Sequence, residues 1–409
     1  MILTATKLLP LEHNSRIIDN GAVAFSHGSI LNVGRVDKII KKYPGHKIAR
    51  LKNAVLMPGL VNLHTHLELP PLLDTIRAET FPEWVLNLIR AKSSLKNKHY
   101  KTAVQENIAA LIHSGTTTVG EICTHGISPA LLKMSGLRSV IYHELISMNP
   151  SNVGKSPLRP PLPKGGWGGL IQFGLSPHAP HTVSESALLQ LKEIARQNKL
   201  RLSMHVAESK DEIRLLQGKR SGFEKLYQMA GWDVSWAPSA YSSIEYLKRL
   251  GLLNPGFLAV HTVQVTNDDI NIIKKTRAPV AHCSRSNKET NVGRMPLKKF
   301  LDAGITVGLG TDSLASSPSL NMWDEMRYAY QIHRRSGISA EDIFRIATIG
   351  GAKALGLEKK LGTLEAGKKA DIIAVPMPSK NTGDIYSDLL RETKTCIMTM
   401  VDGKFLFRV

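Results

Sequence analysis

Eight short apolar runs recur along the middle of the chain, and longer stretches with helical spacing separate them. The runs cover residues 59–64, 116–122, 139–146, 173–178, 202–208, 257–262, 279–283 and 306–312. Strands that alternate with helices are typical of βα units and of a parallel sheet. Eight such units close a (β/α)₈ TIM barrel, so the pattern predicts an α/β fold of this class.

The two chain ends show a different pattern of short β-branched runs punctuated by Gly and Asn. The last two runs flank Asp402-Gly403, a typical hairpin turn. We expect the ends to pair into one small β-sandwich domain, with its first part at residues 1–57 and its second at 356–409, around a barrel at 58–355. The Pro- and Gly-rich segment 151–169 predicts a long surface loop on the active-site side, either an insertion or a lid.

Within the eight runs, apolar residues come first and polar residues last. The polar endings are His64, Glu121, Glu144, His178, His205 with Glu208, His261, His282 and Asp312. The active site of a TIM barrel lies at the C-terminal ends of its strands. These side chains therefore predict where the chemistry takes place.

Three of these residues, together with His66, suit one metal ion. His64 and His66 point to the same side of an extended chain because strand side chains alternate. With His205 and Asp312 they form a His₃Asp set, which fits a catalytic Zn²⁺ with an open position for water. Fe²⁺, Mn²⁺ or cobalt also accept such a set. Taken singly, the histidines could be structural, and Asp312 could cap a helix that starts near Ser319.

Glu208 lies three residues beyond His205. Where the strand gives way to the next turn, its carboxylate can face the bound water without binding the metal, which is the position for a proton shuttle. The alternative is a glutamate in the first turn of a helix, where the helix dipole favours negative charge.

Composition adds limits on partners and location. The 409-residue chain has a formal net charge of +19, but its Lys and Arg residues are dispersed, so we expect no nucleic-acid partner. Three scattered cysteines do not make a disulfide framework, and the first residues do not resemble a signal peptide. No apolar run reaches the roughly 18 residues of a membrane span. We expect a cytoplasmic enzyme with a small-molecule substrate, and a homodimer also fits.

The motifs around these residues resemble those of the amidohydrolase superfamily, over nearly the whole chain. They are MPGLVNLHTHLEL, SPHAPHTVS, MHVAES, AVHTVQV, AHCSRSN and GLGTDSLASSPSLNMWDEM. The nearest likeness is to deaminases of S-adenosylhomocysteine, methylthioadenosine and aminofutalosine and to the related chlorohydrolases. The resemblance implies metal ligands at His64, His66, His205 and Asp312 and a hydroxide-orienting histidine at His261, which Asp312 assists. It also implies a proton shuttle at Glu208, which contacts the substrate, and further substrate contacts at His178 and Trp84.

The resemblance also implies a reaction. Zinc lowers the pKa of a bound water toward about 7, far below that of bulk water, which gives hydroxide at neutral pH for attack on an amino-bearing ring carbon. HTHLELP, Arg285 in SRSN and the Ser-Leu-Ala after Asp312 look closest to aminofutalosine deaminases of the menaquinone route. We therefore expect a 6-aminopurine nucleoside deaminase acting on 6-aminodeoxyfutalosine, with Arg285 at the substrate or, alternatively, as a surface cation.

Other substrates remain open on this reading. His181, Ser284 and Ser317 depart from residues that are common in relatives, and His181 and Ser317, which the resemblance places at the substrate rim, leave the choice of substrate open. The alternatives are S-adenosylhomocysteine, methylthioadenosine, adenosine or guanine as substrate, or hydrolysis of a halide or a cyclic amide. A non-catalytic interaction module is disfavoured because no ligand or shuttle residue is missing.

Overall fold

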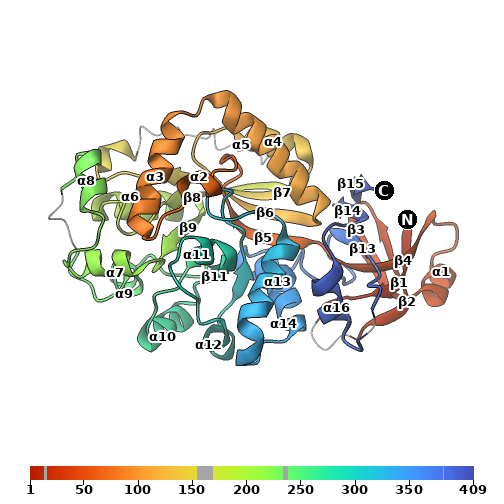
Figure 1. Ribbon diagram of the computed structural model, residues 1–409. Helices are drawn as coiled ribbons and strands as arrows, with labels where there is room; N and C mark the ends of the chain where they lie inside the picture. The colour runs from red at the N-terminus through yellow and green to blue at the C-terminus, as the bar shows by residue number, and fades with distance from the viewer. Residues whose placement is uncertain (13–15, 154–168, 234–237, 381) are drawn as a thin grey trace.

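The computed structural model describes residues 1–12, 16–153, 169–233, 238–380 and 382–409. It contains a barrel with surrounding helices and a separate sheet that lies to the right in Figure 1 and holds both chain termini. Most of the loop predicted at 151–169 lies outside the described residues.

Eight parallel strands form the barrel, and they follow one another in chain order around it. They are β5 (Leu60–Thr65), β6 (Thr116–Cys123), β7 (Arg138–Leu145), β8 (Ile171–Pro177), β9 (Arg201–Val206), β10 (Phe257–His261), β11 (Val280–His282) and β12 (Val307–Leu309). A parallel bridge between Thr65 and Asp312 joins the last strand region to the first. The predicted (β/α)₈ barrel and its eight strands are confirmed.

Helices cover the outside of this barrel and connect its strands (Figure 1). They are α2 (Leu73–Ile76), α3 (Phe81–Ser93), α4 (Asn97–His113), α5 (Ser128–Ser135), η1 (Pro150–Asn152), α6 (Glu185–Asn198), α7 (Lys210–Leu216), α8 (Glu224–Ala230), α9 (Ser243–Arg249), α10 (Asn267–Thr276), α11 (Ser284–Glu289), α12 (Leu297–Asp302), α13 (Met322–His333), η2 (Arg334–Ser336), α14 (Ala340–Arg345), η3 (Ile346–Gly350) and α15 (Gly351–Ala354). In α6, Ser184 caps the helix, and Leu188, Leu191 and Ala195 bury one face at helical spacing.

The two chain ends form one mixed seven-stranded sheet in the order β15-β14-β13-β4-β1-β2-β3. Its strands are β1 (Ile2–Leu8), β2 (Ile18–Ser26), β3 (Ser29–Arg35), β4 (Ile48–Pro58), β13 (Ile372–Pro376), β14 (Met398–Val401) and β15 (Lys404–Arg408), and α1 (Val36–Lys42) and α16 (Ile385–Glu392) belong to the same two ends. Asp402 and Gly403 make the predicted hairpin turn with φ of 51° and 76°. The pairing of the two ends is thus confirmed.

A buried ion pair ties the barrel to this sheet. Arg138, at the start of β7, donates from Nε and Nη2 to the two carboxylate oxygens of Asp371 at 2.9 and 3.1 Å. The two side chains are only 7% and 4% exposed. Such two-pronged geometry satisfies both charges out of water.

Replacing Arg138 with alanine is expected to lower the free energy of unfolding by about 3–5 kcal/mol, because Asp371 would stay buried without its partner. The midpoint of urea unfolding measures this loss. Arg196→Ala is the matched control, since Arg196 pairs with Glu193 on an exposed face of α6 and should leave the midpoint nearly unchanged. Equal shifts in the two variants would contradict a structural role for the buried pair.

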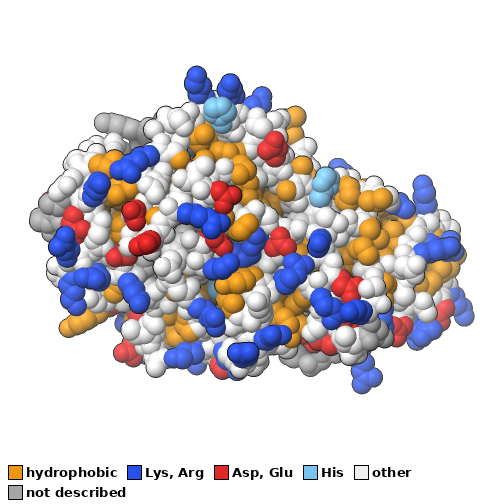
Figure 2. All heavy atoms as spheres, viewed as in Figure 1, with side chains coloured by type: hydrophobic (Ala, Val, Ile, Leu, Met, Phe, Trp, Pro, Cys, Tyr) orange, Lys and Arg blue, Asp and Glu red, His pale blue; other side chains and the backbone are white. Residues whose placement is uncertain are grey.

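The structure shows how the basic side chains, the cysteines and the apolar helices are distributed. Lys and Arg side chains are spread over the face drawn in Figure 2 rather than gathered in one patch. All three cysteines lie in the described part of the chain and are buried and unpaired. Among the described residues, no helix combines the length and apolar character needed to cross a membrane.

Candidate metal centre and active site

Four side chains from three barrel strands converge at one point. His64 lies in β5, His66 follows it directly, His205 lies in β9, and Asp312 follows β12. All four are buried, and their candidate ligand atoms lie within 4.8 Å of one another. The Nε2 atoms of His205 and His64 are 3.1 Å apart. Asp312 Oδ1 lies 3.6 Å from Nε2 of both His64 and His66.

These spacings fit a bound divalent metal. A tetrahedral ion with bonds of about 2.0–2.1 Å holds its ligand atoms about 3.4 Å apart. Burial lowers the pKa of His64, and that of His205 falls well below its usual value, chiefly through burial. Burial alone would raise the pKa of Asp312, but His64 and the neighbouring histidines hold it well below its usual range. Neutral imidazoles and an ionised carboxylate are the forms that bind metal.

Neighbouring hydroxyls fix the orientation of the aspartate. Asp312 Oδ2 accepts hydrogen bonds from Ser286 Oγ at 2.6 Å and Ser316 Oγ at 2.9 Å. Such outer contacts turn a ligand toward its metal. The next helix, α13, begins at Met322 and is capped by Asn321, so Asp312 is not its cap.

Glu208 lies between β9 and α7, and Ser209 caps that helix. Glu208 is therefore not in a first helical turn. Its Oε1 lies 3.6 Å from His261 Nε2, which is itself 4.0 Å from Asp312 Oδ2. Burial, reinforced by the charges of Asp312 and Glu212, raises the pKa of Glu208 well above its usual value. A raised pKa suits a carboxylate that accepts and returns a proton near neutral pH.

Glu212 holds Glu208 in place, a role that the sequence reasoning missed. Its carboxylate accepts hydrogen bonds from the backbone N–H groups of Ala207 at 2.8 Å and Glu208 at 3.1 Å, and from Ser243 Oγ. Ala207 has a φ of 52°, a left-handed conformation that costs energy for a residue with a side chain. The available signal was a glutamate four residues after Glu208, in the first turn of α7.

Asn287 was also missed, and it fixes the orientation of His261. Asn287 Oδ1 lies 2.8 Å from His261 Nδ1, and both side chains are buried. An amide oxygen only accepts hydrogen bonds, so Nδ1 carries the proton and Nε2 presents its lone pair toward Glu208 and Asp312. Asn287 is the last residue of the AHCSRSN motif.

Besides Glu208, the three other predicted substrate residues lie in different surroundings. His178 follows β8, accepts or donates a hydrogen bond at Thr182 Oγ1, and packs with its ring centroid 4.8 Å from that of His205. Trp84 is buried in α3 and stacks on Phe81 with ring centroids 5.7 Å apart. Arg285 donates to Ser319 and so links α11 to the segment before α13. Of the three, His178 is the one in contact with the metal cluster.

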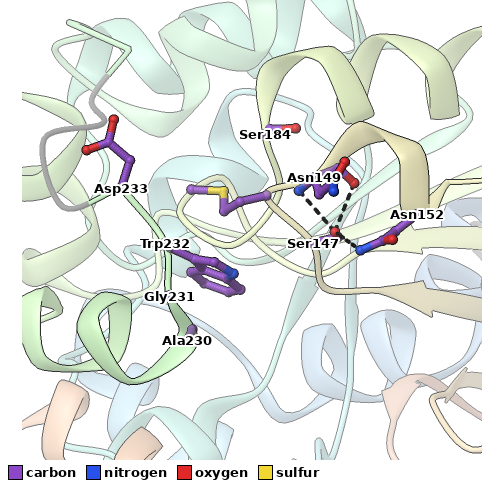
Figure 3. A pocket seen from close by; sticks show the side chains of 9 residues that line it. Ser147, Asn149, Asn152, Ser184, Ala230, Gly231, Trp232 and Asp233 are labelled. Carbon is purple, nitrogen blue, oxygen red and sulfur yellow. Dashed lines mark hydrogen bonds between the residues drawn. The ribbon is translucent and has the colours of Figure 1, made fainter.

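A cavity of about 460 Å³ lies beyond the ends of β7 and β8 (Figure 3). Its polar lining comes partly from Ser147, which follows β7, and Ser184, which caps α6. Trp232 and Met148 add apolar surface. Because it follows the C-terminal ends of two strands, this cavity lies on the barrel face that carries the candidate metal centre.

The fold and the site define a TIM-barrel hydrolase with a candidate His₃Asp metal centre. The sequence pattern of the amidohydrolase family matches residues 55–406, so the chain belongs to the amidohydrolase family. It is an enzyme of the class that hydrolyses carbon–nitrogen bonds.

Named relatives and a solved structure cover nearly the whole chain. A 5'-deoxyadenosine deaminase of Methanosarcina acetivorans is 29% identical over 99% of this chain and 92% of that protein. A 5-methylthioadenosine/S-adenosylhomocysteine deaminase of Syntrophobacter fumaroxidans is 27% identical over 95% and 87%. The structure of Helicobacter pylori aminofutalosine deaminase in complex with methylthio-coformycin is 25% identical, with a TM-score of 0.88 over 99% of both chains.

Proposed function

We propose that the protein is a metal-dependent hydrolytic deaminase of 6-aminopurine nucleosides. The observation that carries the proposal is the buried cluster of His64, His66, His205 and Asp312 with Glu208 and His261 beside it. The names of the relatives, which are deaminases of adenosine-type nucleosides, support the same reaction. We assign the site to one divalent metal, with Zn²⁺ favoured by the three nitrogens and one carboxylate.

The residues divide the reaction between them. When bound, the metal supplies the positive charge that lowers the pKa of water and makes it a nucleophile at neutral pH. Glu208 takes the proton of the attacking water and passes it to the ring nitrogen beside the amino-bearing carbon. His261, oriented by Asn287, holds the water in line for attack. The oxygen of water adds to the ring carbon, the second proton of water passes to the amino group, and that group leaves as ammonia while the ring C=O forms.

Among such nucleosides we favour 6-aminodeoxyfutalosine, which would place the enzyme in menaquinone synthesis. The HTHLELP motif, Arg285 and the Helicobacter pylori neighbour support this choice. Within the proposal, Trp84 covers the purine base and His178 contacts it. Cytoplasmic location and a small-molecule substrate without a nucleic-acid partner complete the proposal, supported by the unpaired cysteines and the spread of basic side chains.

A panel of nucleosides tests this function. Ammonia release by the zinc-loaded protein is compared for aminodeoxyfutalosine, S-adenosylhomocysteine, methylthioadenosine, 5'-deoxyadenosine, adenosine and guanine. We expect the highest kcat/KM for aminodeoxyfutalosine. A higher value for a thio-nucleoside or for 5'-deoxyadenosine would keep the reaction and correct the substrate. Ammonia from none of them would overturn the deaminase assignment.

A further inference from the structure

One carboxylate at the barrel mouth has an oxygen that the protein leaves unpaired. Glu144 lies near the end of β7 and is 9% exposed. Its Oε2 accepts a hydrogen bond from Thr124 Oγ1 at 2.7 Å. Its Oε1 is buried and has no hydrogen-bond partner among the described residues. A buried polar atom left in this state costs free energy, so a ligand group that can donate is expected there.

Strand alternation places this side chain inside the barrel. Tyr142 and Glu144 share one face of β7, because side chains two residues apart in a strand point the same way. Tyr142 belongs to a buried cluster with Leu258 and Val260 of β10, a strand that is not a neighbour of β7 in the sheet. Side chains from strands that are not neighbours meet only inside the barrel, so this cluster fills the barrel interior. Glu144 therefore faces inward, one step closer to the C-terminal mouth.

Glu144 also lies beside the candidate metal centre. On the neighbouring strand it pairs in register with Ser176, and the backbone N–H of His178 donates to the carbonyl of Leu145. His178 in turn packs against His205. His178 thus contacts the metal cluster through its ring and the strand of Glu144 through its backbone. The catalytic steps proposed for Glu208 and His261 do not use Glu144.

The charges around Glu144 indicate which donor fits. Burial raises the pKa of Glu144, but its interactions with His178, His66 and Lys92 and the hydrogen bond from Thr124 lower that pKa by more, so the carboxylate is ionised and only accepts hydrogen bonds. Lys92 lies in the last turn of α3 and already supplies a cation nearby. A neutral hydroxyl therefore suits Oε1 better than a second cation.

We propose that Glu144 binds the sugar of the nucleoside, with Oε1 accepting a hydrogen bond from one ribose hydroxyl. This inference rests on the proposed function, which supplies the nucleoside. It orders the substrate along the barrel mouth, with the base at the metal centre and the ribose at β7. The cavity of Figure 3 begins three residues further on, at Ser147, and gives room for the 5' substituent.

A comparison of adenosine with 2'-deoxyadenosine and 3'-deoxyadenosine tests the contact. A hydrogen bond to a charged group contributes enough that its loss should raise KM about tenfold or more. In the wild-type enzyme, one of the two deoxy substrates should show this rise.

The variant Glu144→Gln tests the same contact from the side of the protein. It should raise KM for adenosine by a similar factor, leave KM for that deoxy substrate unchanged, and keep kcat within a few-fold. Glu106→Gln, on an exposed position of α4, is the matched control and should change neither constant.

Metal content and melting temperature distinguish loss of the ribose contact from loss of the metal or of the fold. Glu144→Gln should keep the metal content and melting temperature of the wild type. Glu144→Asp, which keeps the charge but shortens the side chain, should fall between wild type and Gln in its KM for adenosine. Equal rises in KM for adenosine and both deoxy nucleosides in Glu144→Gln would overturn the contact while leaving the deaminase intact. If the wild type releases ammonia from none of the nucleosides in the panel, both proposals fail.

Discussion

Replacing Glu208 with glutamine is expected to lower kcat by about 10²–10⁴-fold, the usual contribution of a positioned proton carrier. Glutamine keeps the shape of the side chain but cannot take a proton from water. The carboxylate lies 3.6 Å from His261 and is held through its backbone by Glu212, so its loss should not disturb the four candidate ligands. Steady-state kinetics together with metal analysis measure both effects.

The expected pattern is a loss of kcat with unchanged metal content and little change in KM. Glu106→Gln is again the control, because it makes the same chemical change on an exposed helix face. Near-normal turnover by Glu208→Gln would remove Glu208 from the mechanism. Loss of the metal together with activity would instead make Glu208 part of the metal site.

Removing the metal with a chelator is expected to abolish turnover and to lower the melting temperature. Without a cation, three buried imidazole nitrogens and a carboxylate lie within 4.8 Å of one another with no positive charge between them. An ion that binds only the folded state stabilises it by about 2.7 kcal/mol when its concentration is 100 times Kd. Thermal unfolding with and without the chelator measures this loss.

Adding back about one equivalent of Zn²⁺ per chain should restore both activity and melting temperature, as a single His₃Asp site requires. His205→Ala serves as the comparison, because it removes one candidate ligand and should make zinc addition ineffective. Full activity in protein shown to be free of metal would contradict the metal centre.

The barrel could be predicted from sequence because its strands are buried on both faces. The sequence of such a strand is a continuous apolar run, and a polar functional residue occurs only where the strand ends. His64, His205 and Asp312 stood out for that reason. The hairpin at Asp402-Gly403 was equally visible, since its turn chemistry is local.

Contacts that depend on how the elements pack against one another could not be predicted in this way. Asn287 reaches His261 across 26 residues of sequence, and no local periodicity links them. Glu212 was visible only as a helical glutamate, and its bond to the backbone of Ala207 depends on how α7 meets β9. The order of the mixed sheet, with β13 beside β4, is set by packing of apolar faces rather than by any turn.

Glu144 lies between these two cases. Its position at a strand end was visible in the sequence, but its unpaired Oε1 appears only when every neighbouring donor is placed. Sequence therefore predicts which strand ends carry chemistry, and the structure is needed to assign each side chain its partner.

Hydrolysis in heavy-oxygen water tests the central claim most directly. The zinc-loaded enzyme is incubated with a 6-aminopurine nucleoside, and the product is analysed by mass spectrometry while ammonia is counted. The account predicts one ammonia per product molecule and one solvent oxygen in the purine ring in place of the amino nitrogen, with the sugar still attached. Solvent oxygen in the sugar, or consumption of the nucleoside without ammonia, would contradict it.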